Sequence, residues 1–322
     1  MTTIAPARPA AATVDTVRRA GTVRAAVSRG ISGLSARDRT GVWRGLDVDV
    51  ARAVAAAVLG DPEAVTWLPT DPAVRLERLA AGEADLVACN LTWTLGREAA
   101  PPVLFAAINC YDGEGFLVRT ADGIDTPDRL AGLPVAVQAG TTSPSNLEAW
   151  FAGRGLAPVR PIAYPTPARA LDGYVSGGCA AYVLDRIALA GARAGLGDPS
   201  AHQVLEAAIS QEPMALAVRD DDPDWFRICR WTVGFLTAAE HAADQAPPGS
   251  RGRAAAAAAR AAGAHGPALG LDERWAARIL DAVGHYGDVY HRNLGAGSPL
   301  GVPRGLNELW TRGGLHYALP LH

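Results

Sequence analysis

The sequence predicts an α/β protein of two lobes with a helical extension at the C-terminus. Three observations support this expectation. Short apolar stretches alternate with segments of helical spacing over residues 23–89 and again over residues 115–218. A proline pair at 101–102 separates these two regions, and from residue 222 the pattern is helical only. With 322 residues, the chain is long enough to bury two ordinary cores.

The first region begins with an apolar strand at residues 23–27, followed by a loop at 28–43 that is rich in Gly, Ser and charged residues. Residues 47–59 have a wide apolar face at helical spacing, and the Gly-Asp-Pro turn at 60–62 ends that helix. The rest of this region predicts a strand at 65–68, a helix at 72–81 and a strand at 85–89.

The second region repeats the alternation, which is typical of a mostly parallel sheet covered by helices. Its predicted strands are residues 115–119, 134–138, 159–164, 180–184 and 214–218. Its predicted helices are residues 126–131, 145–152, 167–175 and 186–194. The C-terminal part predicts helices at 225–243, 251–262 and 275–286, and a Gly- and Pro-rich tail that wraps the surface from residue 295.

The composition excludes several classes of chemistry. All thirty basic residues are arginine, so neither a lysine Schiff base nor the phosphate-binding lysine of a Walker A loop exists in this chain. The histidines show no metal-ligand spacing on one helix face, and we expect no metal and no cofactor. A net charge of -3 gives no reason to expect nucleic acid, and no apolar run reaches the roughly 18 residues of a membrane span.

The N-terminus and the cysteines bear on location. Residues 1–12 contain Ala and Pro but no basic segment followed by an apolar one, so no secretory signal is predicted. Cys89, Cys110, Cys179 and Cys229 form no CxxC pair. Two disulfides are arithmetically possible, although free buried thiols are the simpler interpretation.

Six segments of the chain carry recognisable motifs. Residues 45–51 read GLDVDVA, and residues 91–97 hold LTWT followed by Arg97. Residues 111–116 read YDGEGF, residues 140–147 hold GTT followed by Asn-Leu, residues 209–213 read ISQEP, and residues 304–317 hold RGLN followed by GGLHY. In this order they resemble the motifs "GFDVD", "TTWT…R", "YDGQGF", "GTT…NL", "ISKEP" and "RGLN…GGLQYAP" of a known family, the amino-acid-binding proteins of ABC transporters, general L-amino-acid branch.

The resemblance implies a periplasmic-binding-protein fold of type II, in which two lobes joined by two hinge strands close over a ligand. Placing the crossings near residues 112–116 and 214–218 assigns 1–114 plus 215–322 to lobe 1, with the C-terminal extension, and 115–214 to lobe 2.

The resemblance also implies a site for an amino-acid-like ligand, whose two charges need partners when they leave water. Arg97 can bind the carboxylate with its planar fork, and Thr141 and Thr142 can add backbone NH groups at a helix N-terminus. Asp185 can accept the ammonium, and Thr92 is a further expected contact.

Each of these residues has a simpler alternative. Arg97 could pair with Glu98 on the surface, Asp185 could cap the helix that starts at Arg186, and Thr141 and Thr142 could be a plain helix start. Thr92 could be an ordinary loop hydroxyl. The resemblance further suggests that the Ser28 loop, Cys89 and Gln138 line a pocket for the ligand's side chain, although the loop could be a plain connection.

Departures from the family pattern concern its cysteines and two site positions. The positions of the family disulfide cysteines hold other residues here, which together with residues 1–12 predicts a cytoplasmic location. Cys89 stands where the family has Arg, and Glu114 where it has Gln. A thiol or carboxylate in a closed cleft could transfer protons, although Cys89 could be an apolar filler and Glu114 a solvated hinge residue.

These departures favour a cofactor-free enzyme of the cytoplasm, which catalyses dehydration, elimination or cyclisation of an amino-acid-like substrate with Glu114 or Cys89 as the acid/base. The alternative is a binding protein of an amino-acid ABC transporter, which binds an L-amino acid without turnover and has a permease as partner. A third possibility is a cytoplasmic ligand-sensing subunit.

Overall fold

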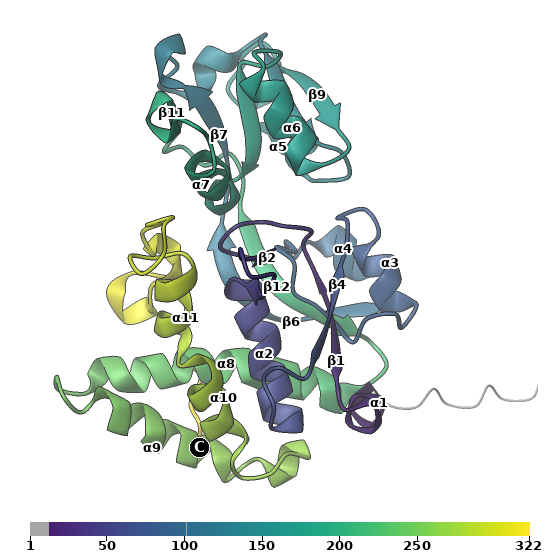
Figure 1. Cartoon of the computed structure of the whole chain (residues 1–322), viewed down its shortest axis with the longest axis vertical. Helices are drawn as coiled ribbons and strands as arrows, with labels where there is room; N and C mark the ends of the chain where they lie inside the picture. The colour runs from purple at the N-terminus through teal and green to yellow at the C-terminus, as the bar shows by residue number, and fades with distance from the viewer. Residues whose placement is uncertain (1–12, 101) are drawn as a thin grey trace, which may run out of the picture.

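The computed structural model describes residues 13–100 and 102–322, which form two α/β lobes, one above the other in Figure 1. Each lobe is built on a five-stranded sheet, and a short two-stranded sheet accompanies the first. The segment 1–12, on which the signal prediction rests, lies outside the described residues, as does Pro101 of the proline pair. Within the described ranges, no helix is both long and apolar enough to cross a membrane.

The sheet of lobe 1 has the strand order β4-β1-β5-β12-β6. Strand β1 (Val23–Val27) runs parallel to β4 (Val65–Pro69) and β5 (Leu86–Val87). Strand β12 (Glu212–Arg219) is antiparallel to β5 and β6 (Val103–Asp112), so it alone runs opposite to the other four strands of this sheet. Hence the carboxyl ends of β1 and β5 point toward the second lobe.

Helix α2 (Leu46–Leu59) packs on this sheet and begins at a glycine for a steric reason. Gly45 has φ 134°, and a Cβ there would lie 2.1 Å from the carbonyl oxygen of Leu34. The other elements of lobe 1 are α1 (Thr13–Ala20), β2 (Ala36–Arg37), β3 (Trp43–Arg44), α3 (Arg75–Ala80) and α4 (Leu95–Ala99).

The sheet of lobe 2 has the order β11-β7-β10-β8-β9. Its strands are β7 (Glu114–Arg119), β8 (Pro134–Gln138), β9 (Arg160–Tyr164), β10 (Ala181–Asp185) and β11 (His202–Val204). Its helices are α5 (Ser143–Ala152), α6 (Pro167–Val175) and α7 (Arg186–Ala194), while the predicted helix at 126–131 is a 3-10 helix, Pro127–Leu130. Strand β8 is parallel to β9 and β10, and β7 is antiparallel to β10 and β11.

The chain changes sheets at two adjacent points. It leaves the first sheet after Asp112 and starts β7 at Glu114, and it returns at Glu212, which is paired with Asp112 in the β6–β12 ladder. Gly113 is the residue of the first crossing and faces the second, so that a Cβ there would be 2.8 Å from both the Ala208 Cβ and the Ser210 carbonyl oxygen. A side chain at this position would therefore push the two crossings apart.

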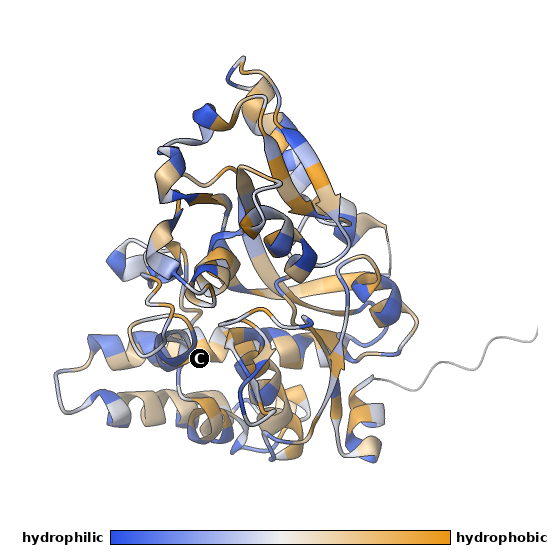
Figure 2. Cartoon of the chain, turned by 45° about the horizontal axis from the view of Figure 1, so that its top comes forward, coloured by the Kyte–Doolittle hydropathy of each residue, from blue (hydrophilic) through white to orange (hydrophobic). Residues whose placement is uncertain are grey.

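A layer of C-terminal helices covers the far side of lobe 1, at the bottom of Figure 1. It contains α8 (Pro223–Gln245), α9 (Arg251–Gly263), α10 (Trp275–Val283) and α11 (Tyr286–Asn293). The single helix predicted over 275–286 is wrong, because Gly284 at φ 74° ends α10 and His285 caps α11. Figure 2 shows the apolar strands inside both lobes and mixed helices around them.

The tail after α11 binds the back of the hinge. The side-chain amide of Asn307 accepts a hydrogen bond from the Tyr111 NH and donates one to the Tyr111 carbonyl oxygen, both of 2.7 Å. These two hydrogen bonds satisfy the backbone groups of Tyr111 on the open edge of β6, just before the chain crosses to lobe 2. All four cysteines are buried and free, as the simpler interpretation predicted.

Candidate functional site

A cavity of about 310 Å³ lies between the two lobes. The walls include eight of the nine residues that the sequence singled out: Ser28, Thr92, Arg97, Glu114, Gln138, Thr141, Thr142 and Asp185. Ser28, Thr92 and Arg97 come from lobe 1 and the others from lobe 2, starting with Glu114 at the crossing. The lobes therefore share one site. Within residues 13–100 and 102–322, no group of three or more His, Cys, Asp or Glu residues could hold a metal ion.

Asp185 supplies the negative side of the cavity. It ends β10, is 7% exposed, and accepts one hydrogen bond of 2.8 Å from the Asn90 side-chain amide. It also occupies the N-cap position of α7, but its side chain makes no capping hydrogen bond, which leaves the carboxyl group to the cavity. Burial first, and then the carboxylates of Asp112 and Glu114, raise the pKa of Asp185 well above its usual value. A cation beside Asp185 would offset the free-energy cost of ionising this buried carboxyl group.

Arg97 supplies a positive group on the opposite lobe. It lies on α4, and its Nη1 donates to the Thr92 carbonyl oxygen at 2.8 Å. Arg97 does not form the alternative ion pair with Glu98. Glu98 instead accepts a hydrogen bond from the Trp93 indole at 2.8 Å. No carboxylate in the described part of the chain pairs with Arg97. Burial and the charge of Arg75 lower the Arg97 pKa, so an anion would be favoured here.

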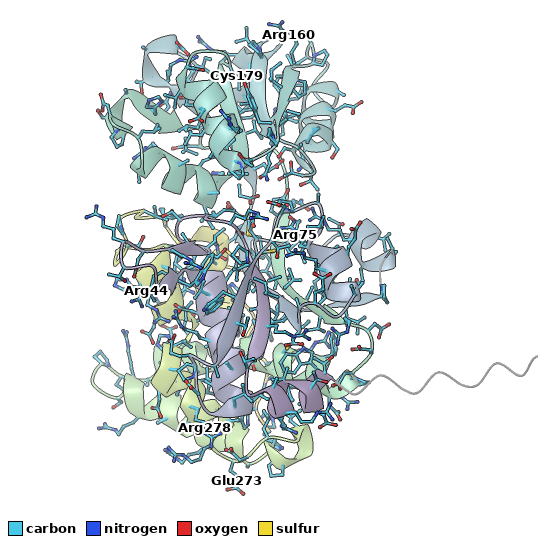
Figure 3. The ribbon with its side chains drawn as sticks, turned by 45° about the vertical axis from the view of Figure 1, so that its right-hand side comes forward. Arg44, Arg75, Arg160, Cys179, Glu273 and Arg278 are labelled. Atoms are coloured by element: carbon cyan, nitrogen blue, oxygen red, sulfur yellow. The ribbon has the colours of Figure 1, made fainter. Side chains whose placement is uncertain are left out.

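Arg75 is a second cavity cation, and the sequence reasoning missed it. It lies on α3, is 5% exposed, and donates from Nη1 to the Cys89 carbonyl oxygen at 2.7 Å. Among described residues it also has no carboxylate partner. Figure 3 shows Arg75 at the boundary between the lobes. The sequence did hold a signal for it. Arg75 is four positions before Leu79, the other buried residue of the helix, so it is an arginine on the apolar face.

The N-terminus of α5 adds hydrogen-bond donors from lobe 2. Thr142 is the N-cap residue and makes no side-chain capping bond, while the Thr141 hydroxyl donates to the Gln138 carbonyl oxygen at 2.8 Å. The backbone NH groups of Thr141 and Thr142 have no hydrogen-bond acceptor within the part of the chain described here. Free NH groups at the positive end of a ten-residue helix suit an anion.

Asn90 is another cavity residue that the sequence reasoning missed, and the motif residue Asp47 positions it. Asp47 accepts hydrogen bonds from the Asn90 NH at 2.8 Å and from the Asn109 amide at 2.7 Å. Asn90 has φ 42°. Its side-chain oxygen accepts a hydrogen bond from the Ser28 hydroxyl at 2.9 Å, and its side-chain NH₂ group donates to Asp185. Burial raises the Asp47 pKa to about 6. The motif therefore orients a cavity residue from behind.

Of the two candidate acid/base groups, Glu114 lines the cavity but has both carboxylate oxygens in hydrogen bonds with α5, and Cys89 does not line the cavity. Glu114 is 2% exposed, not solvated; one of its oxygens accepts from the Ser143 hydroxyl and the other from the Asn146 amide at 2.7 Å. Burial raises its pKa. Cys89 is 1% exposed, does not line the cavity, and has its thiol pKa raised by burial. A buried thiol of high pKa is a poor nucleophile or base.

Comparisons with known proteins identify the family. Residues 23–245 match the model of bacterial extracellular solute-binding proteins, family 3. The chain belongs to this family. It is 37% identical to the general L-amino acid-binding periplasmic protein AapJ of Rhizobium johnstonii, over 97% of this chain and 93% of that protein. It is 36% identical to the glutamate/glutamine/aspartate/asparagine-binding protein BztA of Rhodobacter capsulatus, over 96% and 93% respectively.

A solved family member has the same fold. It is a periplasmic binding protein from Brucella ovis with glutathione bound, 35% identical, with a TM-score of 0.87 over 97% of this chain and 100% of that chain. The type II fold predicted from the sequence is therefore confirmed. The expectation of a cofactor-free enzyme is wrong, because the two relatives named above are amino-acid-binding proteins and the solved structure is a periplasmic binding protein. The engagement of Glu114 and the position of Cys89 give the physical reason.

Proposed function

We propose that this chain is the substrate-binding protein of an amino-acid ABC transporter and binds an L-amino acid in the interlobe cavity without turnover. One observation carries the proposal. Arg97 and Asp185 line the same cavity from opposite lobes, and neither has a partner of opposite charge among the described residues. Leaving the buried charge of Asp185 and the half-buried charge of Arg97 uncompensated is costly unless a ligand supplies both partners.

An α-amino acid supplies both partners at once. Its carboxylate fits between the Arg97 guanidinium and the free NH groups of Thr141 and Thr142, where charge-assisted hydrogen bonds and the α5 dipole act together. Its ammonium fits beside Asp185. Since the carboxylate would contact both lobes and the ammonium would contact lobe 2, binding would hold the lobes together.

Arg75 supports a ligand with a further acidic or amide group. Once Arg97 and Asp185 have taken the zwitterion, Arg75 remains a buried cation without a carboxylate. A side-chain carboxylate or carboxamide would fill that need. The names of two relatives agree with this chemistry, one binding glutamate, glutamine, aspartate and asparagine, the other holding glutathione. We therefore propose acidic amino acids and their amides as the first ligands to test.

Isothermal titration calorimetry with the ligand-free protein tests this proposal. The panel is L-glutamate, L-glutamine, L-aspartate, L-alanine, D-glutamate and glutathione, with mass spectrometry of each ligand after incubation. We expect binding of at least one L-amino acid, loss of binding in Arg97→Ala, and unchanged binding in Arg193→Ala, an exposed arginine of the same chain. Binding of no amino acid would overturn the proposal, and a change in ligand mass would overturn the absence of turnover.

Delivery of the ligand would require a permease as partner, which is also part of this proposal. The cytoplasmic location expected from residues 1–12 and the missing family cysteines stays a prediction. Cell fractionation of the native host with an antibody against the protein tests it. Recovery outside the cytoplasmic membrane would contradict the predicted location and would agree with the transport role.

A further inference from the structure

Glu212 is the first residue of β12, where the chain returns to lobe 1, and its carboxylate contacts both lobes. It is 3% exposed. One oxygen accepts the hydroxyl proton of Thr92, which belongs to lobe 1. The other accepts from the Ser210 hydroxyl at 2.7 Å and from the Asn146 amide of α5 at 3.0 Å. Three donors on two oxygens match an acceptor-only carboxylate.

The bond to Glu212 fixes what Thr92 can do in the cavity. A threonine hydroxyl has one proton and two lone pairs. Because the proton goes to Glu212, the oxygen can only accept hydrogen bonds from a ligand. Thr92 lines the same cavity as Asp185, and its carbonyl oxygen is held by Arg97. A threonine locked in this way favours a donor group and disfavours an anion at the same spot.

We propose that Glu212 is a positioning residue for ligand binding, which holds the Thr92 hydroxyl as an acceptor and thereby makes the site selective for a ligand that carries an ammonium group. The inference rests on the proposed function, since it concerns the same cavity. It assigns a role to a residue that does not line the cavity.

Asn146 ties this arrangement to lobe 2. Its amide donates to Glu212 and to Glu114 and so bridges the two carboxylates. Asn146 lies in the first turn of α5, the helix whose N-terminus presents the NH groups of Thr141 and Thr142. Glu212 therefore holds the donors of lobe 2 and the acceptor of lobe 1 in one network at the hinge.

The substitution Glu212→Gln tests the inference because its amide has one favoured orientation. Ser210 and Asn146 both donate to the same oxygen, so the amide oxygen belongs on that side and the NH₂ group faces Thr92. Thr92 then accepts from the amide, and its own proton must turn away. The cavity gains a donor where it had an acceptor, which opposes an ammonium but not a ligand that lacks one.

The readout is the affinity ratio between L-glutamate and glutarate, which has the same chain of two carboxylates without the ammonium. In Glu212→Gln we expect L-glutamate binding to weaken roughly 10- to 100-fold, from the loss of one hydrogen bond to a charged group, while glutarate changes much less. The exposed Glu206→Gln is the matched control and should change neither affinity. If both ligands weaken equally, the role is only structural and the inference is wrong.

A second pair of variants keeps the test decisive if Glu212→Gln does not fold. Thr92→Ser retains the hydroxyl and should keep the full preference for L-glutamate over glutarate, whereas Thr92→Val should lower that preference, with the remainder due to Asp185. A lowered preference in both variants, or in neither, contradicts the inference. If the wild-type protein binds no amino acid at all, the proposed function fails instead, so the two failures are distinguishable.

Discussion

Asp185→Asn should change ligand affinity and ligand-free stability in opposite directions. The substitution keeps the shape of the side chain and the oxygen that accepts from the Asn90 amide at 2.8 Å. It removes the one negative charge that faces the cavity from the end of β10. Affinity should fall because the ligand's ammonium loses its charged partner.

The size of the effect follows from burial. Asp185 is 7% exposed, so its pair with an ammonium would be almost fully removed from water. Truncating one partner of such a pair costs roughly 2–5 kcal/mol, which is about a 30- to 5,000-fold loss of affinity.

The stability of the ligand-free protein should rise at neutral pH. The pKa of Asp185 is raised in the folded protein, mainly by burial, so its contribution to stability is complete below about pH 4, the unfolded value, and is lost as the pH rises through the folded value. Asparagine has no such loss. The variant should therefore match the wild type at pH 4 and melt higher at pH 8, by about 2 °C for each kcal/mol in a chain of this size.

Calorimetric titration with L-glutamate and L-glutamine measures the first effect, and thermal unfolding followed by circular dichroism at pH 4 and pH 8 measures the second. The exposed Asp128→Asn in the same lobe is the control and should change neither quantity. An affinity within threefold of wild type would refute the assignment of Asp185. A melting temperature that falls equally at both pH values would refute the electrostatic argument.

Three further outcomes follow from the same geometry. Arg97→Lys should bind L-amino acids at least tenfold more weakly by titration, because a point charge cannot replace the planar fork. Arg75→Met should lose any preference for L-glutamate over L-alanine while still binding L-alanine, as competition binding would show. Asp47→Asn should be less destabilising at pH 7 than at pH 4, by about 2 kcal/mol in urea unfolding, because the Asp47 pKa is raised from 3.8 to about 6 and its ionisation costs stability in that window.

The regular elements were predictable where local pattern decides them. Helix α2 and strand β8 follow directly from apolar spacing and a glycine stop. The break between α10 and α11 was missed because Gly284 was not weighed as a helix end and the capping box of His285 and Asp288 is a local geometric feature. The long strand β6 was missed because residues 103–112 lie between the two recognised regions.

The residues of the site also divide into those that the sequence could predict and those that it could not. Arg97 was found because a motif marked it, and Asp185 because the resemblance implied its role at the end of a predicted strand. Asn90 could not be found, since its role depends on a positive φ and on hydrogen bonds with Asp47 and Asp185, which are 43 and 95 positions away in the sequence. Cys89 was misplaced by one position: its neighbour Asn90 lines the cavity, whereas Cys89 packs behind it against Arg75. The enzyme hypothesis was overturned by the relatives, which are binding proteins, and the sequence could not show that Glu114 is held by partners from α5.

A crystal structure of the protein with bound L-glutamate tests most directly whether a zwitterion is held between the lobes. We predict the α-carboxylate within hydrogen-bond distance of Arg97 and of the NH groups of Thr141 and Thr142, and the ammonium beside Asp185. A ligand found in another cavity, or one bound between the lobes with Arg97 and Asp185 both turned away from it, would contradict this account.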